Sequence, residues 1–182
     1  MRILWITLFL SVTLVNCSKK GRNNEQACNG NTRRPVKICT DESVNMIDTN
    51  IVDISVLDFG ELEVPIVDKE TPRQSVEMQV YRITGIIDKV KRYRDGDYHI
   101  RLTDGHDNYV ITEAANPDCD FAFSSVFIEK FREIESLIET SNLQEGDTIS
   151  VIGVSFVDLD HHYKRKQAKN NLELHPILKL EL

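Results

Sequence analysis

The sequence predicts a mainly β domain with one helix, a five-stranded Greek-key barrel of the OB type that follows an extended N-terminal segment. After residue 78, short β-rich segments alternate with turn residues. One stretch with helical spacing falls between the third and fourth of these segments. The resulting order, β-β-β-α-β-β, is that of an OB barrel. The 182 residues, 41% of them hydrophobic, suffice for one such domain plus extra segments.

The first three predicted strands lie between residues 78 and 114. Residues 78–90 are β-rich, and Gly85 within them predicts a bulge or a sharp bend. Residues 98–103 alternate between apolar and polar side chains, and residues 109–114 form the third strand. Turn residues separate these strands and end the last one: Asp95, Gly96, Asp104, Gly105, Asn116, Pro117 and Asp118.

The helix and the last two strands follow. Four apolar residues recur at spacings of four, three and four, which places them on one face of a helix, and Ser124 or Ser125 is expected to cap its start. The apolar residues are Phe127, Phe131, Ile134 and Ile138. Residues 148–157 and 172–182 again show strand patterns, so the predicted barrel domain spans residues 78–182.

Residues 1–16 are typical of a secretory signal peptide, with a short cationic start and an apolar run too short to span a membrane. Cys17 follows directly and precedes polar residues, so the start resembles a bacterial lipoprotein signal in which this cysteine receives acyl chains such as palmitate. Such chains would hold the protein on a membrane of the cell envelope, outside the cytoplasm. The alternative is an ordinary cleaved signal in which Cys17 is incidental.

Charge is distributed unevenly behind the signal. The 22 basic and 29 acidic residues give a net charge of −7. The protein as a whole therefore has no positive potential that would attract polyanions, and any binding site for a polyanion must be local. Residues 17–34 are polar and basic, and we expect a flexible tether there. Residues 35–77 are acidic but contain many apolar side chains. We expect them to pack on the domain as extended segments.

Two basic loops are the predicted ligand-binding elements. In an OB barrel the loops after the first and fourth strands often contact ligands, and here they are residues 89–94 and 161–169. A polyanion such as an oligonucleotide or an acidic glycan, or an envelope protein, is the expected partner. Alternatively, the lysines only keep two loop tips soluble. The predicted ligand-binding residues are Lys91, Arg92, Tyr93, Arg94, Lys164, Arg165 and Lys166.

Four separated motifs occur in the order found in one protein family. They are Asp95-Gly96-Asp97-Tyr98-His99, Glu113 with Asn116-Pro117-Asp118-Cys119, Gly153-Val154-Ser155-Phe156-Val157-Asp158 with His161, and Leu172-Glu173-Leu174-His175-Pro176. Over residues 33–182 the chain therefore resembles a family of uncharacterised bacterial secreted or lipid-anchored proteins with DGDYH, E-x-P-D-P-x-C, GVGFFD-x-x-H and ELHPV motifs. The resemblance implies an OB-like barrel and no particular activity.

The motif residues leave a second function open, that of a metal-assisted hydrolase related in chemistry to phosphodiesterases and nucleases. Imidazoles with a carboxylate can bind zinc or supply a general acid and base. The candidates are His99, His161, His175 and Glu113 for catalysis, and Asp97, His99, His161 and His175 for zinc or calcium. The alternative is that these histidines are structural. A binding module needs no cofactor, and no second arginine accompanies Arg101 as a staphylococcal-nuclease-like site would require.

Three cysteines remain after Cys17. In an exported protein two of them should form a disulfide and leave one over. We favour Cys39–Cys119, which would clamp the N-terminal segment onto the barrel, over Cys28–Cys39, which would close a short loop. No nucleophile motif surrounds any of them, so no catalytic thiol is expected.

Overall fold

The computed structural model describes residue 28, residues 33–160 and residues 165–182. The predicted signal peptide, Cys17 and most of the tether lie outside these residues, as do His161 and Lys164. Among the described residues, no helix has the length and apolar character needed to cross a membrane.

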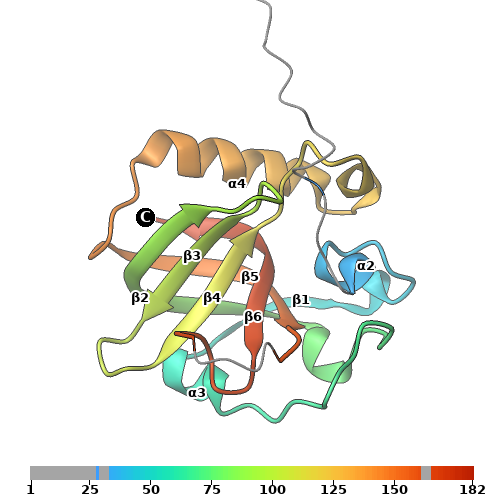
Figure 1. Ribbon diagram of the computed structural model, residues 1–182, viewed down its shortest axis with the longest axis horizontal. Coiled ribbons are helices and arrows are strands. Elements are labelled where there is room, and N and C mark those ends of the chain that lie inside the picture. The colour runs from blue at the N-terminus through green and yellow to red at the C-terminus, as the bar shows by residue number, and fades with distance from the viewer. Residues whose placement is uncertain (1–27, 29–32, 161–164) are drawn as a thin grey trace, which may run out of the picture.

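Five strands form a closed barrel (Figure 1). They are β2 (Gln79–Arg92), β3 (Tyr98–Thr103), β4 (Tyr109–Ala114), β5 (Thr148–Val157) and β6 (Leu172–Glu181). Their order around the barrel is β2-β3-β4-β6-β5, and pairing of β5 with β2 closes it. Only the β4–β6 pairing is parallel among these barrel pairings. The predicted OB-like barrel is therefore confirmed.

Strand β2 bends where it changes partner. Its residues 80–86 pair with β5, and its residues 86–92 pair with β3. Gly85 lies at this changeover, and a Cβ atom there would come within 3.1 Å of both the Leu102 Cβ and the Thr103 carbonyl oxygen. The close approach explains why a glycine stands inside the strand, as the predicted bend requires.

The barrel interior is filled by branched aliphatic side chains, and α4 (Ile128–Ser141) lies across one end of the barrel (Figure 1). The helix buries Phe131, Ile134 and Ile138, as its spacing predicts. The predicted serine cap is wrong, because Phe127 occupies the N-cap position. Ser125 lies two residues earlier, and its hydroxyl donates to the Ile38 carbonyl oxygen at 2.6 Å.

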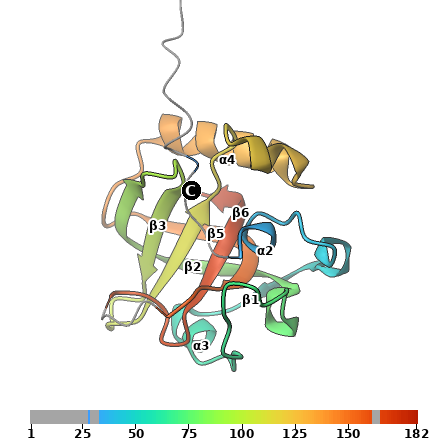
Figure 2. The same ribbon diagram turned by 45° about the vertical axis from the view of Figure 1, so that its right-hand side comes forward.

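The segment before the barrel is only partly extended, which corrects the expectation for residues 35–77. An extra strand, β1, pairs in parallel with β2, while short helices occupy other parts of the segment (Figure 2). The elements are α2 (Arg34–Lys37), η1 (Val44–Met46), β1 (Asp48–Asp53), α3 (Val56–Gly60) and η2 (Ser75–Glu77), and a further short helix, η3 (Asp120–Ser124), precedes α4. None of these helices is long enough to produce a clear apolar period.

A buried ion pair fastens this segment to the barrel. Arg33, which was expected in the tether, is buried and forms a bidentate pair with Glu77 at 2.6 and 2.8 Å. The same guanidinium donates to the carbonyl oxygens of Val157, Thr71 and Pro72. A buried charge is tolerated when it is paired and fully hydrogen-bonded, as here. The folded part of the chain therefore begins no later than Arg33.

The predicted Cys39–Cys119 disulfide is wrong, because Cys119 pairs with Cys28. Ile38 and Cys39 are adjacent in the sequence, but their side chains pack in two different apolar clusters. Ile38 packs with Cys119, whereas Cys39 is a buried free thiol among residues of β2 and β5. Burial raises the pKa of the Cys39 thiol to about 11. The clamp onto the barrel therefore starts from Cys28, a residue assigned by its composition to the tether.

Candidate ligand-binding face

Polar side chains gather on the outer face of β3, β4 and β6. Because side chains alternate along a strand, residues that pair across strands share a face. His99 pairs with Glu113, and Ile111 pairs both with Arg101 and with Glu173. The register thus brings His99, Glu113 and Glu173 to one face, while Ile100 and Leu102 fill the barrel interior.

Glu113 is the centre of this cluster. Its Oε1 lies 2.8 Å from His99 Nε2, and its Oε2 lies 2.5 Å from Lys37 Nζ and 3.3 Å from His175 Nε2. The other nitrogen of His175, Nδ1, bonds to the Lys37 carbonyl oxygen at 2.7 Å. Asp97 completes the group, with Oδ2 3.4 Å from His175 Nε2. Four residues singled out from the sequence therefore lie together, joined by Lys37 from α2.

The buried charges in the cluster compensate one another. Burial alone would lower the pKa of Lys37, but the charges of Glu113, Asp97 and Glu173 outweigh it and raise that pKa. Burial opposes ionisation of Glu113, yet Lys37 and the histidines hold its pKa well below the usual range. Burial and the charge of Glu113 raise the pKa of Glu173 well above its usual range. The cluster therefore contains an ammonium–carboxylate pair beside a carboxyl group, that of Glu173, whose ionisation is disfavoured by burial and by Glu113.

The cluster does not fit a zinc or calcium ion. Asp97, Glu113 and His175 do bring one ligand atom each to within 4.8 Å of one another, a spacing that suits a metal. However, the protonated Lys37 Nζ lies 2.5 Å from Glu113 Oε2 and already supplies the positive charge. Of the other predicted ligands, His99 contacts Glu113 and His161 lies outside the described residues.

Several predicted ligand-binding cations are neutralised by carboxylates of the protein itself. Arg92 pairs with two glutamates of α4, and Arg165 and Lys166 pair with aspartates. The pairs are Arg92–Glu135, Arg92–Glu139, Arg165–Asp158 and Lys166–Asp88, with N–O distances of 2.6, 3.2, 2.6 and 3.2 Å. The second basic loop therefore presents less net charge than its sequence indicates, and its Lys164 lies outside the described residues.

The cations without such a partner lie at the end of β2 and in the turn after it. Lys89, Lys91 and Arg94 form no ion pair with any carboxylate in the described part of the chain. We call Lys89, Lys91, Tyr93, Arg94 and His99 the basic strip. An open hollow of about 570 Å³ runs along residues 91–95, and a small pocket of about 30 Å³ lies between Lys89, Lys91, Tyr93, His99, Arg101 and Ile111.

Aromatic rings accompany these cations. The rings of Tyr93 and His99 lie 3.9 Å apart between centroids, and the Lys91 ammonium lies 4.6 Å from the Tyr93 ring. Tyr93 is 45% exposed, whereas the His99 side chain is 20% exposed. The strip is therefore a shallow, positively charged surface backed by the buried Glu113.

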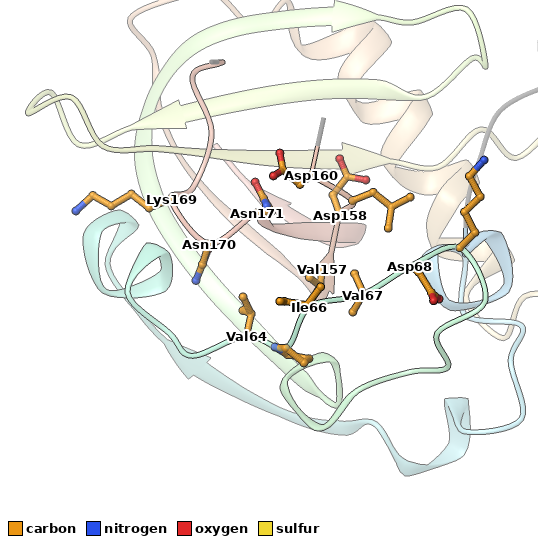
Figure 3. A pocket seen from close by; sticks show the side chains of 13 residues that line it. Val64, Ile66, Val67, Asp68, Val157, Asp158, Asp160, Lys169, Asn170 and Asn171 are labelled. Atoms are coloured by element: carbon orange, nitrogen blue, oxygen red, sulfur yellow. The ribbon is translucent and has the colours of Figure 1, made fainter. Parts of the chain in front are cut away.

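A second hollow of about 580 Å³ lies on another side of the molecule, between residues 64–69 and residues 157–160 and 169–171 (Figure 3). Its floor is apolar, with Val64, Val67 and Val157 turned toward it. Two of the charges at its rim have partners within the protein, because Asp158 pairs with Arg165 and Lys169 contacts Glu61. No set of polar groups converges there that would select a ligand.

The comparisons with known proteins leave the function open. No protein-family model matches the chain, and no curated protein matches it. Solved structures with some likeness include an OBody, AM2EP06, bound to hen egg-white lysozyme, with 10% identity, a TM-score of 0.36, and coverage of 57% of this chain and 78% of that one. Another is the asparaginyl-tRNA synthetase of Entamoeba histolytica, with 11% identity, a TM-score of 0.40, and coverage of 74% of this chain and 24% of that one. Likenesses this weak carry no argument about function.

Sequence reasoning missed two members of the buried cluster. Glu173 had a local signal, since it alternates with Leu172 and Leu174 and so must face outward. No local signal in the sequence marked Lys37, because it lies in a four-residue helix and contacts Glu113, which is 76 residues further along the chain. Only the folded arrangement places its ammonium in the cluster.

Proposed function

We propose that this protein is a non-catalytic binding module of the bacterial envelope, lipid-anchored through Cys17, that holds a polyanionic ligand on the basic strip. One observation carries the ligand proposal. Among the described cations of the two predicted loops, those of the strip are free of acidic partners and surround a hollow. Their position after the first barrel strand is one at which OB barrels commonly bind ligands.

The shape of the strip supports an extended ligand. Enclosed small-molecule sites usually have volumes of roughly 300–1,000 Å³ and bury most of the ligand. The hollow along residues 91–95 reaches that size but is lined by one turn only, and the adjoining pocket holds about 30 Å³. A chain of anionic groups lying along the surface suits such a site better than a compact molecule. The net charge of −7 does not oppose this, because electrostatic attraction to a flexible polyanion is local.

A hydrolase is the less well supported proposal. The 2.8 Å contact between His99 and Glu113 is one that a general base would use. However, Lys37 fills the cluster in which a metal would bind, and among the described residues no serine or cysteine is hydrogen-bonded to His99. Hydrolysis of bis(p-nitrophenyl) phosphate that is lost in His99→Ala would favour this alternative.

The binding proposal is tested by titrating the protein into labelled oligogalacturonate and labelled oligodeoxythymidylate at 50 and 200 mM salt. We expect binding to at least one of them, weakened by salt as phosphate or carboxylate contacts require. The double variant Lys89→Glu/Lys91→Glu should bind at least about tenfold more weakly.

The control is Lys130→Glu/Lys179→Glu, which changes the net charge equally at two exposed sites outside the strip. It should bind nearly as well as the unaltered protein. Equal weakening by both double variants, or no binding of either polyanion at 50 mM salt, would overturn the proposal.

A further inference from the structure

Glu113 determines which nitrogen of His99 carries hydrogen. An ionised carboxylate only accepts hydrogen bonds, and Glu113 Oε1 lies 2.8 Å from His99 Nε2. In the neutral form of this imidazole, Nε2 therefore carries the hydrogen and Nδ1 is an acceptor. The other Glu113 oxygen faces the Lys37 ammonium, which keeps this carboxylate ionised although it is buried.

The acceptor lies among positive charges. His99 lines the small pocket together with Lys89, Lys91 and Arg101, of which Arg101 is paired with Asp88, and no hydrogen bond to His99 Nδ1 is formed within the described part of the chain. A ligand that satisfies this pocket must bring an anionic group for the lysines and, beside it, a hydrogen-bond donor for Nδ1. Hydroxylated anions meet both requirements, and a DNA strand has no hydroxyl groups next to its phosphates.

The tyrosine rings on this side argue against recognition by base stacking. Each ring already contacts a cation of the protein itself: Tyr93 with Lys91 at 4.6 Å and Tyr109 with Lys166 at 4.6 Å. Tyr93 also contacts His99. Proteins that bind single-stranded nucleic acids rely on aromatic rings that are open to the bases.

We infer that the ligand of the basic strip is an acidic glycan, and that His99 selects it by accepting a hydrogen bond from a sugar hydroxyl while Lys89 and Lys91 contact the adjacent anionic group. This inference rests on the proposed function. Lys37 acts through Glu113 as a positioning residue, because it holds the carboxylate that orients His99.

The test compares oligogalacturonate with an oligoacrylate of equal charge, which has carboxylates but neither hydroxyl groups nor N–H groups. One hydrogen bond contributes about fivefold in affinity, so we expect the unaltered protein to prefer the glycan by at least that factor. His99→Phe keeps a ring against Tyr93 but loses Nδ1, and it should abolish the preference. Lys91→Ala should weaken the binding of both oligomers and leave the ratio of their affinities unchanged.

Histidine labelled with ¹⁵N in the unaltered protein provides a readout that does not depend on a variant folding. Oligogalacturonate should shift the Nδ1 signal of His99, and oligoacrylate should not. Equal affinity for the two oligomers, or tighter binding of oligouridylate than of the glycan, would overturn the inference while leaving polyanion binding intact. Failure of every polyanion to bind would instead overturn the proposed function.

Discussion

At the scale of single residues, Lys37 is a lysine used as an internal counter-ion. Its side chain is 9% exposed, and the Glu113 side chain is 3% exposed. Desolvating both charges is costly, so such a pair contributes little net stability, but loss of one partner leaves the other charge buried and alone.

Lys37→Met should therefore destabilise the protein by about 3–5 kcal/mol in urea unfolding, because it leaves Glu113 without its counter-ion. The double variant Lys37→Met/Glu113→Gln removes both charges and should recover part of that loss. A single-variant loss below about 1 kcal/mol would show that the buried pair is not formed.

The raised pKa of Glu173 predicts an unusual dependence of the free energy of unfolding on pH. The pKa of Glu173 is raised in the folded protein, mainly by burial and by Glu113, so the folded state holds a proton that the unfolded chain releases above its ordinary carboxyl pKa. This group's contribution to stability is complete at low pH and is lost as pH rises from that ordinary value toward the raised one.

Glu173→Gln removes this pH-dependent contribution to stability. Between pH 5 and pH 8, the Tm of the variant should therefore rise relative to the Tm of the unaltered protein. A relative gain of about 2–4 °C would correspond to about 1 kcal/mol in a chain of this size. Glu133→Gln, at an exposed position on α4, is the control and should leave the slope unchanged. A Tm difference independent of pH would contradict a raised pKa of Glu173 in the folded protein.

At the scale of elements, the barrel strands were predictable because each carries its own signal. Their alternation of period two and their Asp-Gly and Asn-Pro turns are local, and the five observed strands end within two residues of the predicted limits. The short helices of residues 34–60 were not predictable, since a four- or five-residue helix has no period and forms only through its contacts with the barrel.

The candidate site was partly predictable for the same reason. His99, Glu113 and His175 lie on strands whose alternation and order follow from the sequence, so their common face could be inferred. The pairing of Arg92, Arg165 and Lys166 with carboxylates could not be inferred from the sequence. Their partners belong to other parts of the chain, namely helix α4, Asp158 and Asp88. The disulfide was missed because Cys28 lies in a stretch whose composition is that of a tether.

The Cys28–Cys119 bridge encloses a sequence separation of 91 residues, so its removal should cost about 2–5 kcal/mol, chiefly by freeing the unfolded chain. Cys28→Ser/Cys119→Ser should lower the unfolding midpoint in urea accordingly. Dithiothreitol should lower the midpoint of the unaltered protein to a similar value and should not affect the double variant. An unchanged midpoint in the double variant would contradict a clamp at this position.

At the scale of the whole molecule, acidic and basic groups occupy different places. The exposed strand β1 carries Asp48 and Asp53 at its ends, and charged residues on an exposed strand discourage pairing with other chains. Of the described cations in the two predicted loops, those without acidic partners lie at the other end of β2, in the basic strip. The net charge of −7 thus coexists with one positive surface.

The strip and the second hollow are alternative ligand sites, and one measurement separates them. Amide chemical shifts of the ¹⁵N-labelled protein are followed during titration with oligogalacturonate. We expect saturable, salt-sensitive shifts concentrated in residues 89–101, with little change in residues 64–69 and 157–160. Shifts concentrated around the second hollow, or no shifts at ligand concentrations up to about 1 mM, which corresponds to about −4 kcal/mol of binding, would contradict it.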